Sequence, residues 1–379
     1  MMLFLLCRNL HTAGGKVVGL NFIEALSRNR SKHSFTVVAP LGAGYEKIPL
    51  GRGNKLIVYR GGRNPIAQWR FDTFELPSIV KESRADVVFA MGNVGLVHPP
   101  CPQALLFHKS QLVYPARHYS KERIVSRLKN AALKRRLISC LRQTDLVFCQ
   151  TPIARDRFRQ EFGYREARIR IMPNAVSEFG SISKESAGVP PILRENSFYN
   201  LFFLTKFYAH KNLESLLTLF EKHSDRLKDV RCIVTVARDQ HPNASKFLDE
   251  IRRQGLQEHI VNVGPLKQEE LAGYFYNADA LLFPTLLESF SGTYLEAMHF
   301  GLPILTSGLD FAEYVCGDAA LYFDPWNADE ICNRILLLRQ NPKLKEELVA
   351  KGRERMKRFF KSWDEITYQT VTELEAIAN

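Results

Sequence analysis

Short apolar runs alternate with longer amphipathic segments along this chain. In the first half these runs are Leu3–Leu6, Phe35–Val38, Val87–Ala90, Leu105–Phe107, Leu146–Cys149 and Ile169–Met172. Short continuous apolar runs are typical of buried parallel strands, and most of the stretches between them show the 3.6-residue period of helices. The pattern predicts a doubly wound parallel sheet, which is an α/β fold.

The alternation starts again in the second half of the chain. Here the apolar runs are Leu201–Thr205, Cys232–Val236, Ile260–Val263, Ala280–Phe283, Ile304–Thr306 and Ala320–Phe323. The two series are separated by a stretch rich in Gly, Ser and Pro, which is typical of a connection between domains. We therefore predict an N-terminal α/β domain at 1–176, a linker at 177–198 and a C-terminal α/β domain at 199–360. Ligands bind at the carboxyl ends of the strands in such sheets, so we expect two facing domains with the substrate in a central cleft.

The densest chemical signal follows the predicted strand Ala280–Phe283. A loop of small residues comes next, and a helix is predicted to begin near Ser291 and to end at Gly301. The first turn of a helix has unpaired backbone N–H groups and the positive end of the helix dipole, so this arrangement favours phosphate. The residues expected at this anion site are Ser289, Phe290, Ser291, Gly292 and Thr293.

Two glutamates bracket the same loop. Glu296, on the second turn of the predicted helix, is placed to accept hydrogen bonds from the cis-diol of a ribose. Glu288, at the exit of the strand, would lie nearer to a sugar. The alternative is that both are ordinary solvated carboxylates, and spacing alone leaves that open.

A second strand exit carries Lys206 and Lys211. Two lysines five residues apart on such a loop can converge on one diphosphate and neutralise the charge that builds up on it as a leaving group. No metal would then be needed. Alone, this pattern is also compatible with two exposed surface lysines.

Composition narrows the class of protein. The 379 residues suffice for two domains, and 45% hydrophobic and 24% charged residues are ordinary for a globular protein. The apolar N-terminus, Met1–Cys7, is too short for a signal sequence or a membrane span. Seven scattered cysteines without a Cys-x-x-Cys pattern indicate core thiols in a reducing cytoplasm.

The net charge of +12 suggests an acidic partner. Nine basic residues fall between 117 and 142, namely Arg117, Lys121, Arg123, Arg127, Lys129, Lys134, Arg135, Arg136 and Arg142. Apolar residues recur at helical spacing within the same stretch, which predicts a basic amphipathic helix. Contact of 117–142 with an anionic membrane and an ordinary solvated helix both remain open.

Several of these motifs together resemble a known family. The Glu-x7-Glu spacing of Glu288 and Glu296, the loop with Lys206 and Lys211, and the Met172–Val176 hinge resemble retaining glycosyltransferases of the GT-B fold, in particular glycosyltransferase family 4. The resemblance covers nearly the whole chain. In this fold the last helix, here 361–379, crosses back onto the N-terminal domain.

The resemblance implies a role for each matching residue. Glu296 would hold the donor ribose, Glu288 would contact the transferred sugar, and Lys206 and Lys211 would bind the diphosphate. The base would be recognised by backbone in the loop that begins at Val263.

The N-terminal half carries matches of its own. Gly14 and Gly15 would form a glycine loop that phosphate or acceptor can approach closely, although a flexible turn is the alternative. His108, directly after a strand, would lie against the donor sugar.

The implied activity is transfer of a hexose, with retention of configuration and without a metal or other cofactor. The donor would be a UDP- or GDP-linked sugar and the acceptor a glycan or lipid-linked hydroxyl, in the synthesis of polysaccharide, lipopolysaccharide or glycolipid. Such an enzyme would be cytoplasmic; the alternative is that it is a peripheral protein at the inner face of the membrane.

Two other functions compete with this one. A glycoside hydrolase also needs two carboxylates, but it would not need the lysines. A basic protein that binds membrane or nucleic acid without transferase activity is the other; the sequence lacks recognition-helix, RNP-like and zinc-finger patterns, which disfavours nucleic acid.

Overall fold

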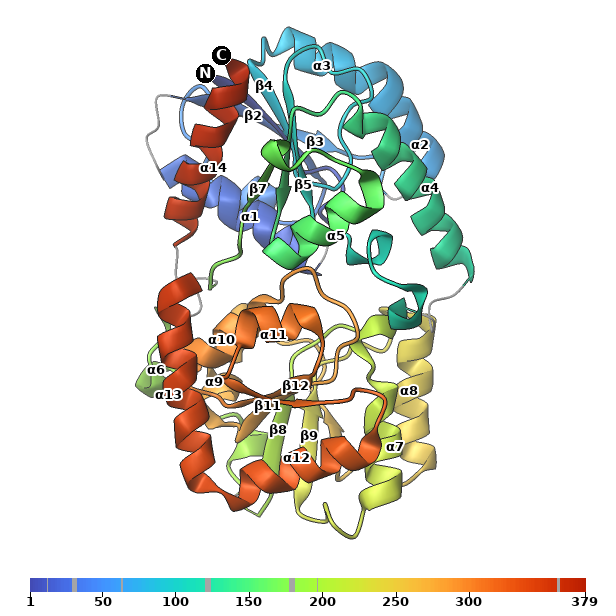
Figure 1. Cartoon of the computed structure of the whole chain (residues 1–379), viewed down its shortest axis with the longest axis vertical. Coiled ribbons are helices and arrows are strands. Elements are labelled where there is room, and N and C mark those ends of the chain that lie inside the picture. The colour runs from blue at the N-terminus through green and yellow to red at the C-terminus, as the bar shows by residue number, and fades with distance from the viewer. Residues whose placement is uncertain are drawn as a thin grey trace. The chain divides into compact units, whose positions relative to one another are not determined.

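The computed structural model describes residues 1–11, 13–28, 33–62, 64–119, 124–176, 181–195, 197–359 and 362–379. The chain forms two compact units (Figure 1). Unit 1 comprises Met1–Tyr114, Arg123–Ala175 and Lys361–Asn379, and unit 2 comprises Pro115–Glu122 and Val176–Phe360. Parts of two predicted features, 177–180 and 196 of the linker and 120–123 of the basic stretch, lie outside the described residues.

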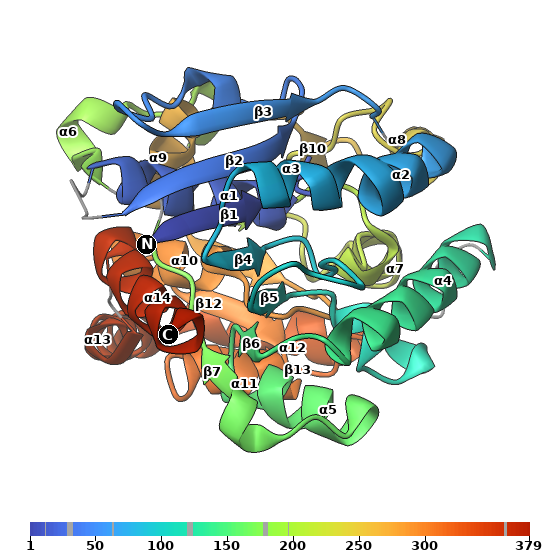
Figure 2. The ribbon, with the colours of Figure 1, turned by 90° about the horizontal axis from the view of Figure 1, so that it is seen from above.

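Unit 1 is built on a seven-stranded parallel sheet in the order β3-β2-β1-β4-β5-β6-β7. Its strands are β1 (Met2–Leu6), β2 (Ser34–Pro40), β3 (Lys55–Tyr59), β4 (Val87–Ala90), β5 (Gln103–Phe107), β6 (Leu146–Cys149) and β7 (Ile169–Ile171). Its helices are α1 (Ala13–Arg28), α2 (Pro65–Arg70), α3 (Leu76–Glu82), α4 (Ile124–Leu141), α5 (Pro152–Phe162) and α14 (Trp363–Ala378). The central strands are buried on both faces, as expected for a sheet covered by crossover helices (Figure 2).

The seventh strand, β3, was not predicted from the sequence. It is an edge strand that pairs with β2, and its residues Lys55–Val58 are exposed or only half-buried. A strand with one free edge carries a shorter apolar run than a central strand, and the glycines on both sides make the segment look like a loop.

The last helix, α14, completes the core of unit 1. Its residues Trp363, Ile366, Val371 and Leu374 are buried in the same apolar cluster as Leu3 of β1. The helix packs beside α1 (Figures 1 and 2). The end of the sequence thus stabilises the domain that contains its beginning.

Unit 2 has a six-stranded parallel sheet in the order β10-β9-β8-β11-β12-β13. Its strands are β8 (Tyr199–Phe203), β9 (Val230–Val234), β10 (Ile260–Asn262), β11 (Ala280–Phe283), β12 (Ile304–Ser307) and β13 (Ala320–Phe323). Its helices are α6 (Lys184–Ala187), α7 (Glu214–His223), α8 (Pro242–Arg253), α9 (Gln268–Asn277), α10 (Gly292–Phe300), α11 (Asp310–Cys316), α12 (Ala328–Gln340) and α13 (Pro342–Phe359). The predicted fold class, two doubly wound α/β units with parallel sheets, is confirmed.

Two strands of unit 2 lie about two residues earlier than predicted. The sequence placed their ends at Thr205 and Val236, whereas β8 ends at Phe203 and β9 at Val234. The hydroxyl of Thr235 explains the difference, because it accepts from the Thr205 N–H (2.9 Å) and donates to the Thr205 carbonyl (2.8 Å). A side chain thus replaces the last rung of the backbone ladder.

The predicted basic helix exists as α4, but Arg117 lies outside it, in the separate 3₁₀ helix Ala116–Tyr119. The amphipathic character of the helix was predicted wrongly. Leu137 and Cys140 are buried, whereas Ile124, Val125 and Leu128 are 75%, 55% and 65% exposed. The apolar positions do not form one buried stripe, because the buried residues of α4 lie only in its second half. The seven cysteines are free; six are buried, as predicted, and Cys101 is half-buried.

Candidate functional site

The anion site predicted in unit 2 has the expected backbone geometry. Strand β11 ends at Phe283, a loop follows, and α10 begins at Gly292 with Ser291 as its N-cap. Ser291 is extended (φ −93°) and its side chain does not cap the helix. The N-terminus of α10 therefore keeps the donor groups that a phosphate would use.

The side chains around this N-terminus are partly enclosed. Phe290 and Ser291 are each 7% exposed, and Ser289, Gly292 and Thr293 are half-buried. A ligand at the helix end would therefore exchange water for a largely protein environment.

Glu296 faces back toward the start of the same helix. Its side chain is 9% exposed, and a Cβ added to Gly292 would lie 3.8 Å from its Oε1. Burial raises the pKa of the Glu296 carboxyl to about 7. Glu296 is thus not a solvated helix residue but a buried carboxyl one turn behind the predicted anion site.

Glu288 and Lys211 form an ion pair in the structure. The Lys211 Nζ lies 2.6 Å from the Glu288 Oε1, and the two side chains are 14% and 12% exposed. The Thr285 hydroxyl lies 2.8 Å from the same carboxylate oxygen, and the Lys211 ammonium lies 4.6 Å from the centre of the Phe283 ring. The carboxylate and the ammonium are therefore held in fixed places by several contacts.

The loops that carry this ion pair are tied together through their backbones. Lys211 ends the 3₁₀ helix η8 (Ala209–Lys211), and the Leu286 N–H donates to the His210 carbonyl at 2.7 Å. Asn212 then turns the chain with φ +58°, and its amide donates to the Pro325 carbonyl at 2.9 Å. Three strand exits, after β8, β11 and β13, thus meet at one edge of the sheet.

The other two residues predicted in unit 2 are placed as follows. Lys206 is exposed on the loop that leaves β8, and its ammonium is not part of the Lys211–Glu288 ion pair. Val263 directly follows β10 and is half-buried; its N–H donates to the Val234 carbonyl at 3.0 Å.

In unit 1, Gly14 and Gly15 lie in the first turn of α1 and not in a loop as predicted. The prediction was wrong because a pair of glycines usually ends a helix. Here the lack of a side chain makes room for another group: a Cβ on Gly15 would lie 3.3 Å from the His108 Nε2. The structure thus brings Gly15 and His108 together.

His108 is held by Asn93, a residue that the sequence analysis did not single out. The Asn93 side chain accepts from the His108 N–H (2.7 Å) and lies 2.9 Å from the His108 Nε2. Since the Asn93 oxygen is used by the first bond, its NH₂ group donates to Nε2, and the ring hydrogen lies on Nδ1. Burial lowers the pKa of His108 to about 4, so the ring is neutral.

The backbone of Asn93 adopts the left-handed conformation. Asn93 has φ +67°, which is uncommon for a residue other than glycine, and it is 8% exposed. The His108 Nδ1 is buried and finds no hydrogen-bond partner among the described residues. His108 is thus a neutral histidine with a fixed tautomer and an unused Nδ1 donor.

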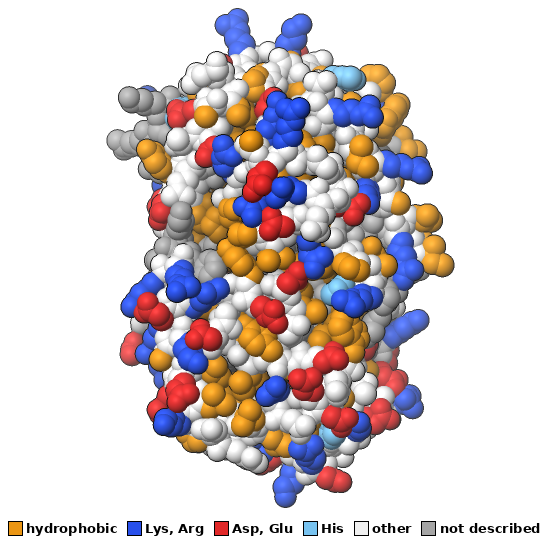
Figure 3. Space-filling model, in the orientation of Figure 1, with side chains coloured by type: hydrophobic (Ala, Val, Ile, Leu, Met, Phe, Trp, Pro, Cys, Tyr) orange, Lys and Arg blue, Asp and Glu red, His pale blue; other side chains and the backbone are white. Residues whose placement is uncertain are grey.

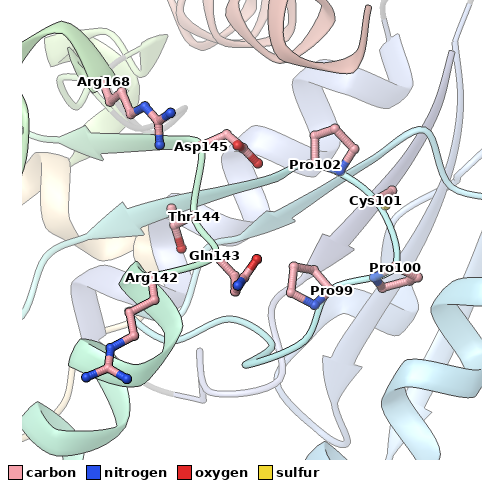
Figure 4. Close-up of a pocket in the computed structure, with 9 residues that line it drawn as sticks. All are labelled: Pro99, Pro100, Cys101, Pro102, Arg142, Gln143, Thr144, Asp145 and Arg168. Atoms are coloured by element: carbon pink, nitrogen blue, oxygen red, sulfur yellow. The ribbon is translucent and has the colours of Figure 1, made fainter.

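Two cavities of unit 1 lie elsewhere. The first, of about 290 Å³, is lined by residues that precede β5, β6 and β7, including Pro102, Asp145 and Arg168 (Figure 4). The second, of about 390 Å³, shares Asp145 and Arg168 with it and is also lined by Glu373 and Ile377 of α14. Both lie at the amino end of the strands, opposite to His108. Neither cavity contains a predicted site residue.

Comparison with known proteins identifies the family. The family model described as Glycosyltransferase Family 4 matches residues 12–178, and the one described as Glycosyl transferases group 1 matches residues 191–355. Together these matches cover most of the chain.

Curated relatives match in part. O-antigen chain mannosyltransferase B of Escherichia coli is 33% identical over 109 residues, which is 29% of this chain and 28% of the relative. Mannosylfructose-phosphate synthase of Agrobacterium fabrum is 20% identical over 243 residues, which is 62% of this chain and 53% of the relative. The matched stretches thus span from about a quarter to about half of the length of these relatives.

Solved structures share the fold along nearly the whole chain. Anabaena Alr3699/HepE, solved in complex with UDP-glucose, superposes with a TM-score of 0.76 at 15% identity and covers 99% of this chain and 100% of its own. WaaG, a glycosyltransferase involved in lipopolysaccharide biosynthesis, gives 0.73 at 15% identity over 99% of both chains. With its two Rossmann-like units and both family matches, the chain has the GT-B fold and belongs to glycosyltransferase family 4.

Proposed function

We propose that this protein transfers a hexose from a nucleotide-diphosphate sugar to a hydroxyl acceptor. The observation that carries the proposal is the Lys211–Glu288 ion pair in unit 2. Its loop continues into the uncapped N-terminus of α10, and the buried Glu296 lies one turn further on. One edge of a sheet thus offers a cation, a phosphate-binding helix end and two carboxyls.

Each of these groups has a separate role in the transfer reaction. The bond between the sugar and the diphosphate breaks, and negative charge collects on the leaving diphosphate. Lys211, Lys206 and the N-terminus of α10 stabilise that charge, while Glu288 contacts the sugar as positive charge develops on it. The acceptor hydroxyl attacks from the face that the diphosphate leaves, which retains the configuration, and its proton passes to the leaving diphosphate. The lysines neutralise the diphosphate in place of a metal ion.

The nucleotide is a ribonucleoside diphosphate linked to a hexose. Glu296 accepts hydrogen bonds from the ribose hydroxyls, and backbone around Val263 reads the base. The matched relative from Escherichia coli is named as a mannosyltransferase, and Anabaena Alr3699/HepE was solved in complex with UDP-glucose. GDP-mannose and UDP-glucose are therefore the first donors to test.

The test begins with thermal shifts by UDP and GDP, followed by product formation from each sugar nucleotide with and without acceptor. A ligand at 100 times its Kd should stabilise the protein by about 2.7 kcal/mol. K211A and E288A should lower turnover by roughly two orders of magnitude.

K222A is the matched control, because Lys222 makes an ion pair of the same length, 2.6 Å, with Asp329 on the surface. Near-full activity of folded K211A or E288A would exclude these roles. Sugar release that does not depend on acceptor would favour a hydrolase.

A second part of the proposal concerns an anionic membrane as the place where a lipid-linked acceptor is met. Within the described part of the chain, no helix is both long and apolar enough to cross a bilayer. Unit 1 has, however, an exposed surface that combines apolar and basic residues. We call it the α2–α4 surface, made of Ile66, Trp69, Phe74, Ile124, Val125, Leu128, Arg127, Lys129 and Arg135.

The two parts of this surface are joined by a charge cluster. Asp72, in the π-helical turn after α2, pairs with Arg136 of α4 and with the buried Arg8 at 2.5 Å. Trp69 and Phe74 pack edge to face at 5.6 Å and are 56% and 63% exposed. Apolar and basic side chains gather along the edge of unit 1 where Figure 1 places α2 and α4 (Figure 3). Aromatic side chains and lysines or arginines together suit a bilayer interface with anionic headgroups.

Flotation with anionic and neutral vesicles tests this surface. The double variant K129E/R135E should lose preference for anionic vesicles, and W69A should weaken flotation in both. K343E/R353E, on the basic helix α13 of unit 2, is the control and should float like the wild type. Equal flotation with both vesicle types would overturn the membrane contact and leave the transferase proposal untouched.

A further inference from the structure

A short segment of the first half of the chain belongs to the second unit. Residues 115–119, which we call the strap, pack in unit 2, whereas the chain before them, to Tyr114, and after them, from Arg123, belongs to unit 1. The strap contains the 3₁₀ helix η4 (Ala116–Tyr119), and η4 packs against η8, which carries Lys211. It therefore contacts one of the loops of the candidate site.

The anchor of the strap is His118. Its side chain is 3% exposed, its Nδ1 lies 2.8 Å from the Leu286 carbonyl, and its Nε2 lies 3.3 Å from the Arg117 Nε. An arginine Nε–H can only donate, so the His118 Nε2 accepts and the hydrogen lies on Nδ1. His118 thus donates a hydrogen bond to Leu286 with a defined tautomer.

The Leu286 peptide is the point where the two site loops meet. Its N–H donates to the His210 carbonyl at 2.7 Å, next to Lys211. Two residues further on is Glu288, and the preceding Thr285 has its hydroxyl 2.8 Å from the Glu288 carboxylate. A hydrogen bond at Leu286 therefore fixes the position of Glu288 and Lys211 together.

Trp326 gives this contact an optical reporter. Its ring centre lies 6.0 Å from that of His118 in an edge-to-face arrangement, and its side chain is 50% exposed. The preceding Pro325 is held by Asn212 at 2.9 Å. A change in the position of the His118 side chain should therefore change the fluorescence emission of Trp326.

We propose that His118 is a positioning residue for the donor-sugar site: through Leu286 it sets the place of Glu288 and Lys211. This inference rests on the proposed transferase function. A small misplacement of such groups is costly for the chemical step. H118A should therefore lower kcat by about 10- to 100-fold, with a much smaller change in the KM for the sugar nucleotide.

Two variants separate positioning from packing. In H118N the amide NH₂ occupies the place of the Nδ1 donor, so the bond to Leu286 is kept. In H118Q the side chain has a similar size, but its amide group lies near the place of Nε2, toward the Arg117 Nε–H. H118Q therefore lacks a donor to the Leu286 carbonyl. H118N should retain most of the wild-type kcat, and H118Q should lose it as H118A does.

His259 is the matched control. Its Nδ1 also lies 3.0 Å from a backbone carbonyl, that of Val230, but at the amino end of β10. H259N and H259Q should leave kcat unchanged. A loss in H259Q equal to that in H118Q, or wild-type kcat in H118Q, would overturn the proposal.

A readout without turnover keeps this inference separate from the proposed function. Two properties of the ligand-free protein are measured, namely amide exchange at Leu287 and Glu288 and the fluorescence of Trp326, with W326F giving the background emission. Both should differ from the wild type in H118Q and should equal the wild type in H118N and H259Q. Failure of the wild type to transfer sugar would overturn the transferase function alone. Unchanged exchange and fluorescence in H118Q would overturn the role of His118 whatever the activity.

Discussion

In the ribose-binding role that we propose for Glu296, two demands act on its pKa in opposite directions. Binding a ribose diol needs a carboxylate, whereas burial raises the pKa of the free protein's Glu296 from 4.5 to about 7. Between these values the unfolded chain has released the proton and the folded chain keeps it, so folding loses stability as the pH rises through this window. Above pH 7 the loss is complete and amounts to about 3 kcal/mol.

We therefore predict that E296Q is more stable than the wild type at pH 8, and that the difference shrinks toward pH 5. Glutamine has the same shape and no proton to release. Thermal unfolding of both proteins across this range should show the gap closing by on the order of 5 °C, while E296Q binds the nucleotide more weakly at every pH. E347Q, at an exposed position of α13, should follow the wild type; a gap independent of pH would contradict the prediction.

Asn93 decides which nitrogen of His108 carries the hydrogen. In N93D the new carboxylate can no longer donate to the His108 Nε2 and accepts from it instead, so the ring changes tautomer and its pKa rises from about 4. We predict a loss of activity of roughly 10-fold or more that becomes larger as the pH falls. Nitrogen chemical shifts of His108 measured across the pH range test the tautomer directly.

N93G serves as the comparison for backbone strain. Glycine accepts φ +67° freely, so N93G removes both hydrogen bonds without straining the turn. It should lose activity and leave His108 neutral over the same range. A neutral His108 in N93D down to pH 5 would show that Asn93 does not control the ring.

The sequence could predict His108 but not Asn93. A histidine directly after a strand stands out by its chemistry. An asparagine between glycines is typical of a turn, and its role depends on hydrogen bonds with a residue 15 positions away. Lys211 and Glu288 were predicted one by one, and only the structure shows them as an ion pair across 77 positions.

At the scale of elements, the first turn of α1 shows how backbone and site are linked. Gly14 and Gly15 are neighbours in the same helix, but a Cβ on Gly14 would meet nothing within 4 Å, whereas one on Gly15 would lie 3.2 Å from the Leu10 side chain and 3.3 Å from the His108 Nε2. We predict that G14A gains about 0.5–1 kcal/mol of stability from helix propensity. G15A should gain less stability than G14A or should lose stability, and it should shift the NMR resonances of His108.

Chemical denaturation of the two variants side by side, with the wild type, measures the free energy of unfolding. Comparing G14A with G15A removes the contribution of helix propensity, because both substitutions replace glycine by alanine in the same helical turn. Equal gains in G14A and G15A, with unchanged His108 resonances, would show that the space beside Gly15 is not restricted.

Elements differed in how far the sequence determined them. The helix from Gly292 to Phe300 was predicted almost to the residue, because Ser291 and Gly301 mark its ends with opposite backbone preferences. The exposed first half of α4 could not be predicted, because helical spacing of apolar residues does not say whether anything covers them.

At the scale of the whole molecule, two series of strands were enough to predict two α/β units, but not which residues each unit contains. The strap leaves unit 1 for unit 2, and α14 joins unit 1 after 360 residues of chain. Both assignments depend on contacts between distant parts of the sequence, which the local pattern does not contain. Only the resemblance to the family pointed to the course of the last helix.

This arrangement predicts that the two units can be destabilised separately. Leu374 of α14 is fully buried in the core of unit 1, and Leu338 of α12 is 1% exposed in unit 2. Each Leu→Ala change should cost about 2–5 kcal/mol. In native-state hydrogen exchange, L374A should speed up exchange in β1 and β4 and leave β8 and β11 near wild-type rates, and L338A should do the opposite. Equal acceleration of all four strands in both variants would show that the units unfold as one, so that α14 would stabilise unit 2 as well.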